Sequence, residues 1–333
     1  MSPSSRLPFP LRLRSNPALW GLLLAFAGCG GRPTQPLSVP DAGACLTSAC
    51  TEADSGTPPD PSGPRVRIAA FNVHRLFDTV CDSGSCGGSA YEELPTEAEL
   101  AQKVDRLGRA ITALNADVVM LEEVETQRSL DALQAHTPGF DYSELGETGA
   151  PASVDVAVLS RYPIIEVRHH RDYLVRPDGS STRFSRELLE VHVDVNGERA
   201  IVFAAHFRSK VDDDPGRRFA EATVSRDTVT AVAKEFPSAL VVFGGDLNDT
   251  PGSDAINALE KDGALLRVAS DRPDSETWTY VYSGQRQAID HLFLARGGGT
   301  YVPGSFRVAR DGNSYGGSDH GAVYADFGFA SRP

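Results

Sequence analysis

The sequence predicts an α/β fold in which two β-sheets pack face to face and helices lie on the outside. Its many apolar runs have the length of strands, and a few longer segments carry apolar residues at helical spacing. The pair Asn196-Gly197 separates two of the strand-like runs, as the turn of a β-hairpin does. Many strands and hairpins with a few long helices favour a two-sheet sandwich.

The expected strands are short runs rich in Val, Ile, Leu, Ala and Phe. They lie at residues 66–72, 117–121, 153–160, 188–195, 200–205, 240–244, 280–282, 288–294 and 322–327. A helix is expected over 96–114, behind Thr96, a good N-cap with Glu99 three residues on. A second helix, over 219–236, turns three valines inward, namely Val224, Val229 and Val232.

Residues 1–29 have the pattern of an export signal. Arginines near the start precede an apolar run at 18–27, which is too short to span a bilayer. The run ends in Phe-Ala-Gly-Cys, which resembles a bacterial lipobox, in which Cys29 becomes the lipidated first residue. An ordinary secretory signal cut near Ala27 is the alternative. We therefore expect the protein outside the cytoplasm, anchored through lipid to the bacterial cell membrane or outer membrane.

Residues 30–64 are rich in Pro, Gly, Ser, Thr and Asp, which predicts a flexible tether. The folded domain is then expected over residues 65–330, roughly 265 residues that suit one large α/β unit. A composition that is 41% hydrophobic and 23% charged is ordinary for such a domain. Nothing in the sequence implies a protein partner, so we expect a monomer.

Four cysteines remain when Cys29 is set aside: Cys45, Cys50, Cys81 and Cys86. An even number in an exported protein predicts two disulfides. Both pairs show C-x4-C spacing, so local bridges 45–50 and 81–86 are the simplest connectivity. A zinc site made of all four is the alternative, although it lacks the tight C-x2-C spacing.

Polar side chains follow the buried strands at the points where they end. Each such strand is followed by, or contains, an acid, an amide or an imidazole: Asn72, Glu122 and Glu123, His206, Asp246 and Asn248, Asp290 and His291, and Asp319 and His320. Any one of them alone is equally consistent with a turn residue, a helix start or an N-cap. Together they predict that these groups gather at one edge of the sheets, on a rigid scaffold.

These blocks, in this order, resemble the endonuclease/exonuclease/phosphatase superfamily, also called DNase I-like. The resemblance covers about residues 65 to 329 and rests on Phe71-Asn72-Val73, Leu121-Glu122-Glu123-Val124-Glu125, Leu159-Ser160-Arg161-Tyr162-Pro163, His206-Phe207-Arg208-Ser209-Lys210, Gly245-Asp246-Leu247-Asn248-Asp249, Ile289-Asp290-His291 and Ser318-Asp319-His320. It implies a four-layer sandwich of two mostly antiparallel mixed sheets, with 65–330 as the catalytic domain. The one departure is Glu122, where the family more often has Gln.

The resemblance also implies catalytic roles. Asp246 would position and deprotonate the attacking water, and Asn248 would contact the phosphate. His320 would bond a phosphoryl oxygen, with Asp290 orienting its ring. His206 matches the histidine that the DNase I and sphingomyelinase branches use near the leaving group, whereas the apurinic-endonuclease branch typically differs there.

The metal site implied by the resemblance consists of Glu123, with Asn72 beside it and Asp319 supporting the region. Carboxylate and amide oxygens suit a hard cation, so Mg²⁺ or Mn²⁺ is expected, and Ca²⁺ is a further option. A zinc site on three histidines, namely His206, His291 and His320, is a weaker alternative because no close i,i+4 pair exists.

Charge bears on the substrate. The net charge of −13 argues against tight, sequence-reading DNA binding but not against a nuclease, because a metal can meet the phosphate. The stretch from Arg161 to Arg186 is locally rich in arginine, so we expect Arg161 and Arg186 to contact the substrate on a phosphate track. A solvated strand face with ordinary ion pairs is the alternative for this stretch.

The sequence therefore predicts a metal-dependent phosphodiesterase, most simply an endonuclease acting on nucleic acid outside the cytoplasm. A phosphodiesterase or phosphatase acting on a phospholipid or a small phosphate ester is the first alternative. A surface lipoprotein that keeps the fold as a binding module is the second. Motifs fix the reaction centre and not the group attached to the phosphate.

Overall fold

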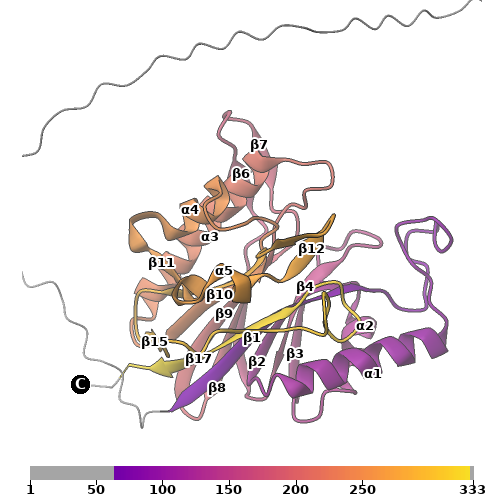
Figure 1. The fold of residues 1–333 in the computed structure, drawn as a ribbon, viewed down its shortest axis with the longest axis horizontal. Coiled ribbons are helices and arrows are strands. Elements are labelled where there is room, and N and C mark those ends of the chain that lie inside the picture. Colours follow the sequence, from indigo (N-terminus) through magenta and orange to yellow (C-terminus); the bar gives the residue numbers. More distant parts are fainter. Residues whose placement is uncertain (1–63, 331–333) are drawn as a thin grey trace, which may run out of the picture. The chain divides into compact units, whose positions relative to one another are not determined.

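The computed structural model of the chain describes residues 64–330 (Figure 1). The expectations for the signal peptide, for lipidated Cys29, for the tether and for a Cys45–Cys50 bridge lie outside the described residues. Within residues 64–330, no helix is both long enough and apolar enough to cross a membrane.

The first sheet is mixed, with one parallel strand pair. Its order is β15 (Gly299–Tyr301), β17 (Ala322–Phe329), β1 (Arg65–Leu76), β2 (Val118–Val124), β4 (Asp155–Ser160) and β3 (Tyr142–Gly146), and β16 (Arg307–Ala309) also pairs with β17. Strands β1 and β2 run parallel, and the other pairs are antiparallel.

The second sheet repeats this arrangement. Its order is β11 (Leu265–Arg267), β14 (Asp290–Ala295), β10 (Leu240–Asp246), β9 (Glu198–His206), β8 (Leu188–Val195) and β5 (Ile164–His169). Strands β9 and β10 are its parallel pair. Two separate hairpins join β6 (Tyr173–Val175) to β7 (Ser181–Arg183) and β12 (Tyr280–Tyr282) to β13 (Gln285–Gln287).

Four layers result, as the sequence predicts. Apolar side chains of both sheets form one core between them, including Ile68, Met120, Val202 and Val242. Helices α1 (Glu97–Ala113) and α2 (Gln127–Gln134) share a second core with the outer face of the first sheet. Helices α3 (Pro215–Glu235) and α4 (Asp254–Glu260) share a third core with the outer face of the second sheet. Three short helical turns complete the chain: η1 (Lys261–Gly263), η2 (Val268–Asp271) and α5 (Asp274–Thr277).

The N-termini of the two long helices are set by capping residues. At α1 the Thr96 side chain and the Glu99 carboxylate form the expected capping box. The second long helix begins at Pro215 and not near residue 219, because Asp214 caps it and proline suits its first turn. That turn also buries Arg218, a charged residue that hydrophobic periodicity does not detect.

The two parallel pairs decide where the chemistry lies. Parallel neighbours end at the same edge of a sheet, so the residues that close β1 and β2 meet, and so do those that close β9 and β10. The register sets Asn72 beside Glu122 in the first sheet and His206 beside Asp246 in the second.

Candidate active site

Asp246 occupies the centre of this edge. It is the last residue of β10, and the register places it between His206 of β9 and Asp290 of β14. All three side chains are buried. His206 Nε2 lies 3.6 Å from Asp246 Oδ2, and one ligand atom each of Asp246, Asp290 and His320 lie within 4.8 Å of one another.

His320 is held by a carboxylate on one side and by an aromatic ring on its face. Its Nδ1 lies 2.9 Å from Asp290 Oδ2, and its Nε2 lies 3.9 Å from Asp246 Oδ2. The ring of Tyr280, in the β12–β13 hairpin, stacks on the imidazole with centroids 4.8 Å apart. Ser318 Oγ donates to the carbonyl of Asn72 at 2.6 Å and accepts from the His320 N–H, which fastens this loop to β1.

These surroundings raise the pKa values of both His320 and Asp246. Burial alone would lower the pKa of His320, but the charges of Asp290, Asp246 and Asp319 outweigh it and raise the pKa to about 10. Burial, and then the nearby charge of Asp290, raise the pKa of Asp246 to about 7. At neutral pH His320 is therefore a cation, while Asp246 is poised to exchange a proton.

Asn72 links Asp246 to the expected metal carboxylate. Its amide nitrogen donates to Asp246 Oδ2 at 3.0 Å and to Glu123 Oε1 at 3.2 Å. Its oxygen accepts the His74 N–H at 2.9 Å, so the amide presents its N–H groups to the two carboxylates. The structure thus shows Asn72 as the bridge between these carboxylates, with its oxygen on the backbone side.

Glu123 lies on a bulge at the end of β2. The strand register shifts between Glu122 and Val124, and Glu123 has a φ of 67°, a conformation that non-glycine residues rarely adopt. The Arg75 N–H donates to its Oε2 at 2.9 Å. Because the bulge reverses the strand alternation here, the glutamate side chain turns toward the edge that holds Asp246.

Glu122, the departure from the family pattern, is fully buried near Asp246 and Asp290. Neither of its carboxylate oxygens has a hydrogen-bond partner among the described residues. Burial, followed by the charges of Asp290 and Asp246, raises its pKa well above the ordinary range. A neutral carboxyl has nearly the shape of the glutamine that is more frequent in the family, and this explains how the substitution is accommodated.

His206 is buried and neutral. Burial lowers its pKa well below the ordinary range, and the charges of Arg186 and His320 act in the same direction. Its Nδ1 has no hydrogen-bond partner among the described residues. A neutral imidazole beside Asp246 contributes a polar contact, whereas His320 supplies the positive charge.

The remaining predicted residues lie around this centre. The Asn248 N–H donates to Asp246 Oδ1 at 2.9 Å, and the Asn248 amide donates to the carbonyl of Phe207 at 3.3 Å. Asp319 is about half exposed, and its Oδ1 lies 3.6 Å from His74 Nδ1. Both are therefore placed to meet a ligand from the solvent side.

Of the two arginines expected as substrate contacts, Arg186 acts on His206 through its charge, whereas Arg161 lies away from the site. Arg161 lies directly after β4, at the end of the sheet where β2 begins and thus opposite Glu123. Its guanidinium donates to the carbonyl of Ala116 and covers the ring of Phe140 at 4.4 Å. Sequence proximity to a strand did not reveal which end of the sheet this residue occupies.

The arginines between them hold the structure together. Arg168 bonds to both oxygens of Glu235 at 3.0 Å and to Glu166 at 2.8 Å. Arg171 donates to a backbone carbonyl, and Arg176 pairs with Asp214. The alternative of ordinary ion pairs therefore describes Arg168 and Arg176, and Arg171 is held by a backbone carbonyl.

The donors at this edge fit a hard divalent cation. Glu123, Asp246 and Asp290 offer carboxylate oxygens, which such cations prefer. The zinc alternative finds no support, because in the described part of the chain no cluster unites the three histidines. His291 alternates away from Asp290 on β14, and its Nε2 lies 2.9 Å from the carbonyl oxygen of Asp249.

The structure adds two residues that the sequence did not single out for the site. Tyr280 was expected in a strand, but its contact with His320 depends on how the hairpin folds over the site. Tyr91 lies in the loop after β1, where the charges of Arg186 and Glu123 act on its hydroxyl. No motif marks either tyrosine.

Comparisons with known proteins agree with this geometry. The model of the Endonuclease/Exonuclease/phosphatase family matches residues 69–320. No curated protein sequence matches the chain. Among solved structures, truncated TDP2 of Caenorhabditis elegans is similar with a TM-score of 0.56 at 19% identity, over 80% of this chain and 98% of that one.

Two further solved structures have the same fold. An endonuclease/exonuclease/phosphatase of Bacteroides vulgatus gives a TM-score of 0.58 at 16% identity, over 80% of this chain and 99% of that one. TDP2 of D. rerio, complexed with a single strand DNA product, gives 0.54 at 19% identity, over 79% and 98%. At such identities the likeness concerns the fold.

Proposed function

Because the chain belongs to the endonuclease/exonuclease/phosphatase family, whose members hydrolyse phosphoesters, we propose that it is a metal-dependent nuclease that acts outside the cytoplasm. The observation that carries the proposal is the position of Asp246. This buried carboxylate contacts Asn72 and faces both His206 and His320. A nuclease needs a proton acceptor and a fixed positive charge at one phosphate, and this edge offers both.

In the proposed reaction Asp246 orients the attacking water and takes its proton. Its raised pKa suits this task, since a base works best when its pKa lies near the working pH. The Asn72 and Asn248 N–H groups hold the two oxygens of the carboxylate in a fixed orientation. The water is thereby presented from one direction to the phosphorus.

His320 stabilises the phosphoryl oxygen on which negative charge grows. Asp290 fixes the ring through Nδ1, which leaves Nε2 to donate into the site. The stacked ring of Tyr280 restricts rotation of the imidazole. A preorganised cation of this kind acts without reorganising as the charge develops.

The cation would be held by Glu123, with Asp319 supporting the region, while the Asn72 amide orients Glu123 and does not present its oxygen to the cation. Bound Mg²⁺ or Mn²⁺ would neutralise charge on the phosphate and its leaving oxygen. Glu123 is already oriented for this by the Arg75 N–H and the Asn72 amide. His206, being neutral, would contact the leaving group of the phosphate without carrying a charge of its own.

Nucleic acid is proposed as the substrate on two grounds. TDP2 of D. rerio, which shares the fold, was solved with a single strand DNA product. In this chain the charge of Arg186 acts on His206 at the reaction centre, and a guanidinium so placed is suited to a second backbone phosphate. We also propose that Cys29 is lipidated, which would anchor the enzyme to the bacterial membrane.

The test is a side-by-side assay of the purified domain with Mg²⁺ on plasmid DNA, single-stranded DNA, RNA, sphingomyelin and an inositol phosphate. The nuclease proposal expects turnover of DNA or RNA, with Asp246→Asn as the inactive control. Turnover of sphingomyelin or the inositol phosphate without turnover of nucleic acid would replace the proposal by the lipid or small-ester alternative. No turnover of any substrate by folded protein would favour the binding module.

A further inference from the structure

The loop between β1 and α1 carries an exposed aromatic residue to the edge of the site. Tyr91 is 51% exposed, although it belongs to the folded part of the loop. Its ring packs against the buried ring of Phe77 at 90°, with centroids 6.0 Å apart. The Arg75 guanidinium lies 4.9 Å from the centre of the Tyr91 ring. An arginine packed on a tyrosine offers a flat, partly apolar surface to the solvent.

This Tyr91–Arg75 pair is connected directly to the reaction centre. The backbone N–H of Arg75 donates to Glu123, while its side chain reaches the tyrosine. Lys103 Nζ donates to the Arg75 carbonyl at 2.7 Å and fixes the same backbone from the other side. Arg75 thus connects the Tyr91 ring to Glu123, and the charges of Arg186 and Glu123 act on the Tyr91 hydroxyl.

A disulfide closes the loop that carries Tyr91. Cys81 and Cys86 are joined, with Cα atoms 5.8 Å apart, as the C-x4-C spacing predicts. The next residue, Gly87, donates its N–H to the carbonyl of Glu92 at 2.9 Å, and Cys86 and Glu92 form an isolated β-bridge. The cross-link therefore fixes the chain immediately next to Tyr91. Since both sulfurs are bonded to each other, a metal site on these cysteines is excluded in this form.

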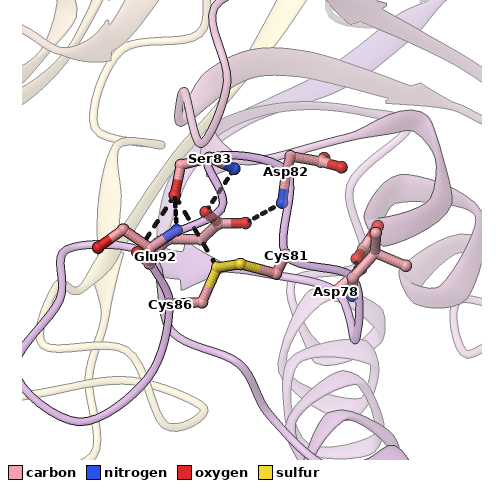
Figure 2. The surroundings of a disulfide bond; sticks show 8 residues. Asp78, Cys81, Asp82, Ser83, Cys86 and Glu92 are labelled. Atoms are coloured by element: carbon pink, nitrogen blue, oxygen red, sulfur yellow. Dashed lines mark hydrogen bonds between the residues drawn. A yellow bond between two sulfur atoms is a disulfide. The ribbon is translucent and has the colours of Figure 1, made fainter.

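The Glu92 carboxylate completes the brace. It is buried and accepts the N–H groups of Asp82 at 2.6 Å and Ser83 at 2.9 Å, beside the disulfide (Figure 2). Burial alone would raise its pKa, but the hydrogen bonds from Ser83 and Asp82 outweigh it and lower the pKa. At the start of the loop, the Asp78 N–H donates to Glu125 at 2.8 Å. An exposed tyrosine held this firmly is preordered for contact with a ligand.

We propose that the Tyr91–Arg75 pair is a stacking site for the nucleobase that flanks the scissile phosphate, and that the Cys81–Cys86 loop holds it there. The inference rests on the proposed nuclease function and extends it. A base stacks on aromatic rings and on guanidinium planes, whereas a phosphate is bound by charge and hydrogen bonds. Arg186, whose charge acts on the Tyr91 hydroxyl, suits the neighbouring phosphate of the same strand. Tyr91 is thus a substrate-binding residue, and the disulfide loop positions it.

The test uses three dinucleotides, each with a single phosphodiester bond: one with both bases, one lacking the 5′ base and one lacking the 3′ base. Their scissile bond and its charge are the same. The wild-type enzyme with Mg²⁺ should lose on the order of tenfold in kcat/KM when one particular base is absent, the scale of one base–aromatic stack. The loss should appear mainly in KM.

Tyr91→Ala should show that same loss on the complete dinucleotide and no further loss on the abasic one. Tyr91→Phe should keep the wild-type loss on removal of the base, because the ring and not the hydroxyl does the stacking. Tyr142→Ala is the matched control, since Tyr142 is an exposed tyrosine on β3, at the opposite end of the first sheet. It should leave all three substrates unchanged.

Cys81→Ser combined with Cys86→Ser should resemble Tyr91→Ala, with normal kcat/KM on the abasic dinucleotide as evidence of an intact centre. If Tyr91→Ala lowers activity on complete and abasic substrates equally, the residue only supports the fold, and the inference is overturned while the nuclease function stands. If wild type shows no dependence on either base, the inference also fails. If no nucleotide is cleaved but methyl p-nitrophenyl phosphate is, the proposed function fails together with it.

Discussion

The Nδ1 atom of His320 lies 2.9 Å from Oδ2 of Asp290, and this pair determines the charge that the site presents to a phosphate. Asp290 is held by its place in β14, and its backbone N–H donates to Thr279 Oγ1 at 3.2 Å. His320 comes from a loop near the C-terminus, 30 residues later. The two are joined by the fold rather than by sequence proximity.

Removing the Asp290 charge should weaken catalysis at high pH first. Activity requires ionised Asp246 and cationic His320, so it should rise as pH passes about 7 and fall as pH passes about 10. A bound divalent cation favours ionised Asp246, which shifts the lower limb to 7 or below. Asp290→Asn should move the upper limb to lower pH. A kcat/KM profile with an unmoved upper limb would contradict the assignment.

Asp246→Asn and His320→Ala should each lower kcat by at least about 10²-fold, the general scale for losing a base or a charge-stabilising group. Both residues lie at the edge of the sheets, so the variants should still fold, as circular dichroism can verify. Near-normal turnover by either folded variant would mean that the centre is assigned wrongly.

Hydrolysis should require an added divalent cation. Mg²⁺ or Mn²⁺ should support it and EDTA should abolish it, since the carboxylates at this edge otherwise repel a phosphate. Glu123→Gln should raise the Mg²⁺ concentration needed for half-maximal activity by on the order of tenfold or more, the general scale for weakened metal sites. Full activity in the presence of EDTA would show that hydrolysis does not depend on a divalent cation.

The salt dependence should distinguish the arginines. Arg186→Gln should flatten the dependence of KM on salt, because one phosphate contact is lost. Arg168→Gln should leave that dependence unchanged and lower the free energy of unfolding by up to about 1 kcal/mol, since Arg168 joins Glu166 and Glu235 in a partly exposed network. If Arg168→Gln and not Arg186→Gln flattened the salt dependence, the substrate would instead bind along strand β5, which carries Arg168. Urea unfolding and salt titration of KM measure the two effects.

Cys29→Ser should release the protein from membranes without altering catalysis by the domain. Mass spectrometry of the wild-type N-terminus should find an acylated Cys29. An unmodified N-terminus at another residue would mean plain secretion through an ordinary signal.

Local pattern was enough to predict most of the buried strands and the polar residues that close them. Strand 188–195 was predicted with its observed bounds, and the capping box at Thr96 set the start of α1. Short elements such as α2 and β5 were not predicted. These two elements bury few apolar side chains, so their sequences show no clear periodicity. Their stability comes from the neighbouring elements on which they pack.

The sequence by itself determined that acids, amides and imidazoles close the buried strands, because strand ends follow from local apolar runs. Only the tertiary structure decided how these groups act on one another. The bulge at Glu123, the neutral state of Glu122 and His206, and the position of Arg161 at the far edge all depend on register and burial. Register and burial arise from contacts between residues far apart in the chain. Local periodicity in the sequence does not predict such contacts.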